Sequence, residues 1–119
     1  MNDFIENGLV LLPFIVGTTF LMVGLLIKKK PPKKINPIYG YRTKRSMKDQ
    51  KSWDFAQRHS AKEMSNAGLY LLVFSILGYF IKLPQNISYP IGMGIMLILM
   101  VNMFLQTEKA LKARQTEKP

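Results

Sequence analysis

Side chains that could bind a charged or amphipathic ligand gather in one segment of the chain, from Ile35 to Gln57. Arg42 carries a planar guanidinium group, which can form paired hydrogen bonds with a phosphate or carboxylate group. Tyr41 and Trp53 are amphipathic aromatic residues, which favour the interface between a bilayer and water. Two interpretations follow from these residue types. The segment is either an anchor at the membrane surface, with Arg42 paired to Asp54 or to a lipid phosphate, or a preorganised binding surface.

The remainder of the chain offers little support for catalysis or metal binding. It has no cysteine, which excludes disulfides, thiolate catalysis and cysteine metal sites. His59 is the only histidine, and a single nitrogen ligand near Glu63 in a basic setting is a poor metal site. No nucleophile stands beside a recognisable base. We therefore predict that the protein is not an enzyme and that it binds no cofactor or metal.

Three apolar blocks surround this segment, one before it and two after it. The first, at about 8–27, contains twenty residues without a charge, enough to cross about 30 Å of hydrocarbon as a helix. The second and third, at about 64–82 and 89–106, are near the short end of the usual length of a membrane span. A soluble bundle is the alternative, and the first block disfavours it because it is apolar all round. We predict an all-α integral membrane protein with three transmembrane helices in a single domain, 1–119.

The distribution of charge predicts the orientation of these spans. Residues 28–63 include twelve Lys or Arg against three Asp or Glu, whereas residues 82–88 include a single Lys. The tail from Gln106 onward is also basic, and the first seven residues contain only acidic charges. The positive-inside rule places the 28–63 loop and the C-terminus in the cytoplasm and the N-terminus outside. The net charge of +10 is thus interpreted as a topology signal and a contact for anionic lipid headgroups, with no nucleic-acid partner.

Local sequence signals predict an ordered turn early in the 28–63 loop. Asn36 precedes Pro37, an arrangement that disfavours a helix at the asparagine. Gly40 allows a tight bend because it has no Cβ atom. We therefore expect an irregular but ordered turn, and not a strand, between Ile35 and Thr43.

A short interfacial helix is predicted after this turn. The run Ser46-Met47-Lys48-Asp49 has approximately the form of a capping box, which marks the start of a helix. We expect the helix to open at Ser46 and to anchor Trp53 at the cytoplasmic membrane surface. The far end of this helix stays open: it either runs straight into the second span, or Ser65-Asn66 forms a kink or a cap before that span.

Small residues in the spans are placed for close helix packing. Gly17 and Gly24 are seven residues apart in the first span, and Gly68 and Ser75 have the same spacing in the second. Small side chains let two backbones approach where lipid provides no hydrophobic drive for association. The spacing suits packing within one chain and also a homo-oligomer. No ionisable side chain lies deep within a span, which argues against an ion-coupled transporter.

The segment also resembles a known family, the bacterial SdpI immunity proteins. The matching residues are Asn36-Pro37, Gly40-Tyr41-Arg42-Thr43, Ser46, Trp53 with Ala56-Gln57, and Gly68 in the next span. The Gly-Tyr-Arg-Thr element, with a tryptophan eleven residues after the arginine, is the most specific part of the pattern. The resemblance covers about 35–78, and the chain is similar to the short, three-span form that lacks the additional N-terminal spans of longer members.

The resemblance implies a multi-pass protein of the bacterial cytoplasmic membrane that protects its cell against a membrane-active antimicrobial or toxin peptide. It implies a toxin peptide, a cytoplasmic regulator and membrane lipids as candidate partners. A second function stays open, because the best-known member of the family also holds a transcriptional repressor at the membrane. A small transport subunit is disfavoured by the absence of charge within the spans.

The resemblance also assigns a binding role to the residues at the matching positions. These are Asn36, Pro37, Gly40, Tyr41, Arg42, Thr43, Ser46 and Trp53. Physically, the glycine would permit the bend, the two hydroxyl residues would close local hydrogen bonds, and Arg42 with Trp53 would hold the loop against the bilayer. Arg42 is expected to be the residue whose loss abolishes function without preventing insertion.

Overall fold

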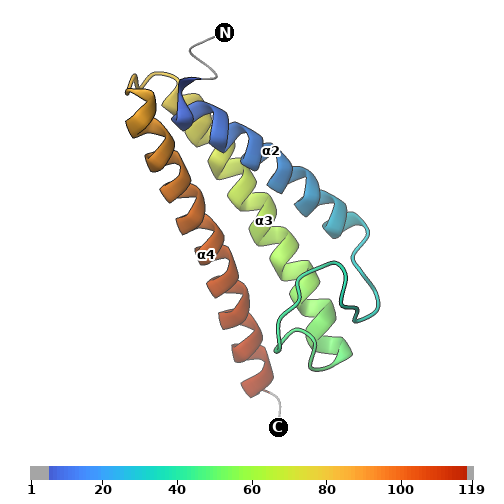
Figure 1. The fold of residues 1–119 in the computed structure, drawn as a ribbon. Helices are drawn as coiled ribbons and strands as arrows, with labels where there is room; N and C mark the ends of the chain where they lie inside the picture. The colour runs from blue at the N-terminus through green and yellow to red at the C-terminus, as the bar shows by residue number, and fades with distance from the viewer. Residues whose placement is uncertain (1–5, 118–119) are drawn as a thin grey trace.

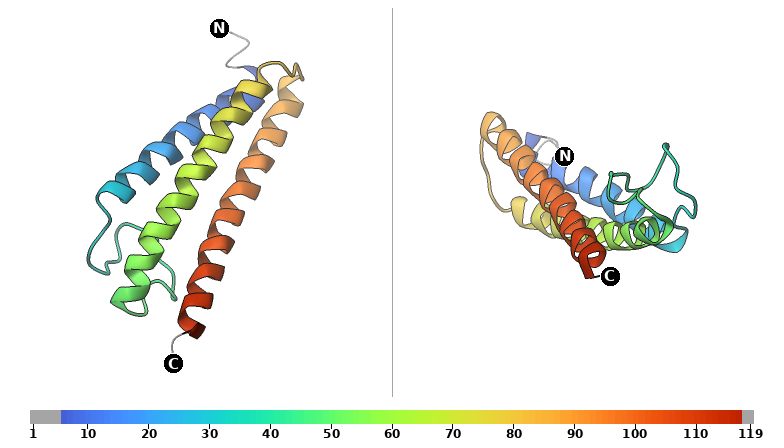
Figure 2. Two further views of the ribbon diagram at one scale, coloured as in Figure 1. Left: turned by 180° about the vertical axis from the view of Figure 1, so that it is seen from behind. Right: turned by 90° about the horizontal axis from the view of Figure 1, so that it is seen from below.

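The computed structural model describes residues 6–117, which form three helices within that range and no strand (Figure 1). Helix α2 covers Gly8–Lys29, α3 covers Gln50–Gly78 and α4 covers Gln85–Glu117. The body is elongated, with extents of 55 × 25 × 21 Å. The start of α2 and the short α3–α4 connection lie at one end, and the long α2–α3 loop lies at the other beside the end of α4 (Figures 1 and 2). The predicted all-α class is confirmed.

The start of α2 is tied to the end of α3 by a single asparagine. The side-chain oxygen of Asn7 caps α2 by accepting a hydrogen bond from the amide of Leu9 at 2.9 Å. Its amide group donates to the carbonyls of Gly78 at 3.1 Å and Ile81 at 3.2 Å. One side chain therefore satisfies orphan groups at two helix ends and fixes the ends relative to each other.

Helices α2 and α3 approach each other at backbone distance. A Cβ atom placed on Gly68 would lie 2.6 Å from the amide nitrogen of Leu21 and 2.7 Å from the carbonyl oxygen of Gly17. Further along, the buried hydroxyl of Ser75 donates to the carbonyl of Val10 at 2.8 Å. The predicted close packing through small residues is confirmed between these two helices of one chain.

The structure corrects the predicted start of the loop helix. Helix α3 begins at Gln50, and the carboxylate of Asp49 caps it by accepting from the amide of Ser52 at 2.7 Å. The prediction that a helix opens at Ser46 is wrong, because that hydroxyl is already engaged in hydrogen bonds within the loop. The predicted interfacial helix is not a separate element, since α3 runs unbroken for 29 residues to Gly78. Of the alternatives for its far end, direct continuation into the segment predicted as the second span is the one observed.

Within the described part of the chain, α2 and α4 are each long and apolar enough to cross a membrane. The predicted spans 8–27 and 89–106 lie inside these two helices. Residues 64–78 of the predicted span 64–82 form the second half of α3, and residues 79–82 lie beyond its end. The first half of α3 is the polar stretch that is predicted as part of the loop. Helix α4 continues without a break through the basic tail.

Candidate functional site

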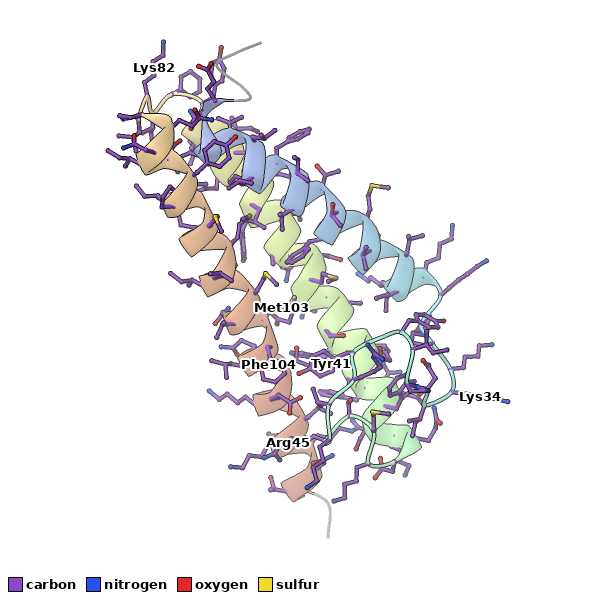
Figure 3. All side chains as sticks on the ribbon, viewed as in Figure 1. Lys34, Tyr41, Arg45, Lys82, Met103 and Phe104 are labelled. Atoms are coloured by element: carbon purple, nitrogen blue, oxygen red, sulfur yellow. The ribbon has the colours of Figure 1, made fainter. Side chains whose placement is uncertain are left out.

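The α2–α3 loop, residues 30–49, folds over the start of α3 and reaches across to α4 (Figure 3). Trp53 lies beneath it on the first turn of α3 and is completely buried, with 0% exposure. Its indole Nε1 donates to the carbonyl of Pro32 at 2.7 Å. The prediction that Trp53 anchors the membrane surface is therefore wrong, because the ring packs inside the protein and holds the loop against α3.

One turn further along α3, Gln57 forms two hydrogen bonds with the loop backbone at Tyr41. Its side-chain oxygen accepts from the amide of Tyr41 at 2.7 Å, and its side-chain amide donates to the Tyr41 carbonyl at 2.8 Å. Gln57 is also completely buried, so these two bonds satisfy a polar group that would otherwise be costly to bury.

The position before Tyr41 requires a residue without a Cβ atom, and Gly40 occupies it. Its φ angle is +105°, a left-handed conformation that residues with a Cβ atom rarely adopt. A Cβ atom there would also lie 2.7 Å from the side-chain oxygen of Gln57 and 2.9 Å from Cγ of Pro32. The predicted bend at Gly40 is confirmed, and its close neighbours show why no larger residue fits.

The predicted turn before Gly40 is also present and is organised by Asn36. Its side-chain oxygen accepts from the amides of Ile38 at 2.9 Å and Tyr39 at 2.8 Å, which forms an Asx-type turn around Pro37. Arg42 donates from its guanidinium to the carbonyl of Pro37 and stays exposed to solvent.

Arg42 does not pair with Asp54, the acidic partner that the sequence suggested. The carboxylate of Asp54 instead accepts from the side-chain amide of Gln50 at 2.8 Å, one turn back on α3. Arg42 is thus placed by the turn that precedes it and points its charge outward, where a lipid phosphate or another anionic group could reach it.

Thr43 and Ser46 close the second part of the loop. The Ser46 hydroxyl accepts from the amide of Thr43 at 2.7 Å, and the Thr43 hydroxyl accepts from the amide of Ser46 at 3.2 Å. Ser46 is fully buried and also donates toward the Tyr41 carbonyl at 3.2 Å. The expected local hydrogen bonds of these two hydroxyl residues are confirmed.

Glu108 connects the loop to α4. One of its carboxylate oxygens accepts from the hydroxyl of Tyr41 at 2.6 Å and from the hydroxyl of Thr43 at 2.9 Å. The other lies 3.7 Å from Nε of Arg45. Burial raises the pKa of the Tyr41 hydroxyl well above its ordinary value, and the Glu108 carboxylate raises it further. The phenol therefore stays protonated and continues to donate.

Trp53, Gln57 and Glu108, together with the loop groups they bind, are called the loop clamp below. The binding residues predicted from the sequence include Trp53, whereas Gln57 belongs only to the matching family pattern and Glu108 to neither. Glu108 lies 67 positions after Tyr41, and an acid in a basic tail carries no local signal of such a contact.

The end of α4 makes further contacts with α3 and the loop. The guanidinium of Arg114 lies 5.0 Å from the centre of the Phe55 ring, a cation–π distance. The side-chain amide of Gln115 donates to the carbonyl of Arg45 and to the hydroxyl of Ser52, both at 3.0 Å. These contacts position the tail so that Glu108 faces the loop.

His59 and Glu63 lie one turn apart on α3 with 3.5 Å between ring nitrogen and carboxylate oxygen. No third histidine or carboxylate joins them, and residues 6–117 contain no group of three such residues that could hold a metal ion. The pair is a local contact on the helix surface.

This fold and site define a small helical membrane protein in which a basic loop is clamped over the ends of two helices. The model of the SdpI/YfhL protein family matches residues 33–106, which include most of the loop and all of α3. The uncharacterized protein YfhL of Bacillus subtilis (strain 168) is 41% identical over 96 residues, covering 81% of this chain and 82% of that protein. The chain therefore belongs to the SdpI/YfhL family, as the loop motif predicted. No solved structure matches the chain significantly.

Proposed function

We propose that this protein is an SdpI-like immunity factor that protects a bacterial cell against a membrane-active antimicrobial or toxin peptide. Family membership supports this role. The observation that carries this proposal is that the buried loop clamp holds a loop whose outer surface exposes both charged and apolar side chains. Beside the exposed Arg42, the apolar side chain of Ile38 is 80% exposed and Tyr39 is 54% exposed. A charged group next to exposed apolar groups on a rigid loop suits an amphipathic peptide.

The proposal includes a multi-pass arrangement in the cytoplasmic membrane. Helices α2, the second half of α3 and α4 would each cross it, with the N-terminus outside and the loop and C-terminus inside. Exposed apolar side chains on the second half of α3, such as Val73, Ile76 and Leu77, support the middle span because water would solvate them poorly. The concentration of Lys and Arg in the loop supports the orientation.

A docking platform for a cytoplasmic regulator is the second candidate. The observation that favours it is the row of exposed basic residues on the loop and the first turn of α3, including Lys44, Lys48 and Lys51. Such a surface suits an acidic soluble partner. Trp53 is not part of this surface because it is buried, so Arg42 and the lysines are the residues to substitute in a co-purification assay.

The deciding experiment is the survival of toxin-sensitive cells that express the protein and are challenged with a panel of membrane-active peptides. Wild type is expected to protect, and Arg42→Ala is expected to lose about tenfold in protection, the effect of one charge-assisted hydrogen bond. Arg58→Ala is the matched control, since Arg58 is an exposed arginine on α3 outside the loop.

Membrane accumulation of each variant is measured by immunoblot in the same cells. Full protection by Arg42→Ala would show that the loop is not the binding surface. No protection by wild type against any peptide, with normal accumulation, would contradict the immunity role and favour the docking platform.

A further inference from the structure

A cavity of about 540 Å³ lies where the loop meets α2, α3 and α4. Leu26 of α2, Met64 of α3 and Met103 of α4 contribute to its walls, and Tyr41 lines it from the loop. Figure 3 shows Met103 and Tyr41 in the space between α4 and the loop. Its size falls in the usual range of small-ligand sites, and its walls are mostly apolar.

The cavity has a positively charged rim. Lys29 and Lys30, at the end of α2, are the charged residues in its lining, and both are exposed. They come one residue after the apolar run of α2, which ends at Ile27, so they lie at the depth where hydrocarbon gives way to headgroups in a membrane. Basic pockets between membrane helices attract anionic lipid headgroups.

Two of the three hydroxyl groups in the lining, those of Tyr41 and Ser60, already have partners inside the protein. The hydroxyl of Tyr41 donates to Glu108, and the hydroxyl of Ser60 donates to the carbonyl of Gln57 at 3.3 Å. A peptide would bring backbone amides and carbonyls that need partners in such an apolar space. A hydrocarbon chain needs none, and the walls suit it better.

We propose that this cavity binds one acyl chain of an anionic phospholipid from the surrounding leaflet, with Lys29 and Lys30 at the headgroup phosphate. The lipid would fill the space between α4 and the loop and would support the loop from below. The site requires a membrane location and does not require the immunity role. Lipid binding is measured without any toxin, so failure of one proposal leaves the other standing.

The test is native mass spectrometry of the purified full chain in detergent with added phosphatidylglycerol or phosphatidylcholine. Wild type is expected to retain phosphatidylglycerol about tenfold better, because each basic group near an anionic lipid adds attraction. Lys29→Gln with Lys30→Gln is expected to lose this preference. Lys33→Gln with Lys34→Gln removes the same charge from exposed loop positions outside the cavity and is expected to keep it.

A second pair of variants tests the chain-binding part. Met103→Trp would fill the cavity and is expected to lower phosphatidylglycerol retention about tenfold. Met100→Trp places the same ring one turn earlier on α4, outside the lining, and is expected to retain lipid. Circular dichroism monitors folding. If Met103→Trp does not fold, the comparison of the two lysine double variants tests the lipid site by itself.

Three outcomes would overturn the lipid site. Equal loss in both lysine pairs would show general attraction to a basic surface. Equal retention of phosphatidylcholine would remove the role of the lysines. Binding of an added membrane-active peptide that Met103→Trp abolishes, with lipid retention unchanged, would identify a peptide as the occupant.

Discussion

The α2–α3 interface and the loop clamp hold neighbouring parts of one molecule by different chemistry. At the interface, backbone meets backbone across Gly17 and Gly68, and an added Cβ atom would lie 2.6 Å from a main-chain nitrogen. At the clamp, buried or half-buried side chains from α3 and α4 bind the loop through directed hydrogen bonds. The first depends on the absence of side chains and the second on their identity.

The α2–α3 interface therefore determines whether the protein folds, and the loop clamp determines how the loop is presented for binding. Close backbone packing tolerates no added atom, because interiors are dense and main chain moves at high cost. A hydrogen-bonded clamp can lose one bond and keep the rest of the helical body in place. We therefore expect substitutions at the interface to unfold the protein. Substitutions at the loop clamp are expected to detach the loop and leave the helices folded.

The largest effect is expected from Gly68→Leu. The new side chain would collide with the backbone of Leu21 and force α2 away from α3, at a cost of about 3 kcal/mol or more. Thermal unfolding in detergent, followed by circular dichroism, measures the loss. Gly94→Ala is the control: an added Cβ atom there meets nothing within 4 Å, and it should stabilise α4 by about 0.5–1 kcal/mol. Equal melting temperatures for Gly68→Leu and wild type would contradict the rigid interface.

Gln57→Leu is expected to rank second. It leaves the amide and carbonyl of Tyr41 without their buried partners, which costs about 1–3 kcal/mol. Because the helices stay packed, the visible result should be faster trypsin cleavage after Arg42 and Lys44 with little loss of helical signal. Unchanged cleavage would show that Gln57 does not hold the loop, and Arg58→Ala on the exposed face serves as control.

The bond between the loop and α4 is tested by a double-mutant cycle of Tyr41→Phe and Glu108→Ala. A coupling free energy of about 0.5–1.5 kcal/mol is expected, since the two groups hydrogen-bond directly at 2.6 Å. Glu108→Gln keeps an acceptor oxygen and should lose less stability than Glu108→Ala. Strictly additive effects would mean that the hydroxyl and the carboxylate act independently.

The smallest effect is the dependence of stability on alkaline pH. The pKa of Tyr41 is raised in the folded protein by burial first and by Glu108 second. Above about pH 10 the unfolded tyrosine loses its proton while the folded one keeps it. Stability from this group is thus complete below about pH 10 and declines as pH rises toward the folded pKa. Tyr41→Phe should flatten the decline in melting temperature above about pH 10 relative to wild type.

Hydropathy, spacing and local turn signals were sufficient for several features of this protein. The apolar blocks predicted the helices, and Asn36 with Gly40 predicted the turn. The seven-residue spacing of small residues predicted close helix packing, which the structure shows between α2 and α3. The loop motif predicted the family. These features follow from properties of neighbouring residues, such as backbone freedom and periodic burial, which the order of amino acids contains directly.

The helix start and the loop clamp depended on three-dimensional contacts. Ser46 and Asp49 are both acceptable caps, and the choice of Asp49 follows from the engagement of Ser46 with Thr43. The burial of Trp53 under Pro32 and the contact of Tyr41 with Glu108 join positions 21 and 67 residues apart. A hydroxyl or carboxylate group needs a hydrogen-bond partner, but its residue type does not identify that partner. The partner is determined only when packing of the helices brings the two groups within hydrogen-bond distance.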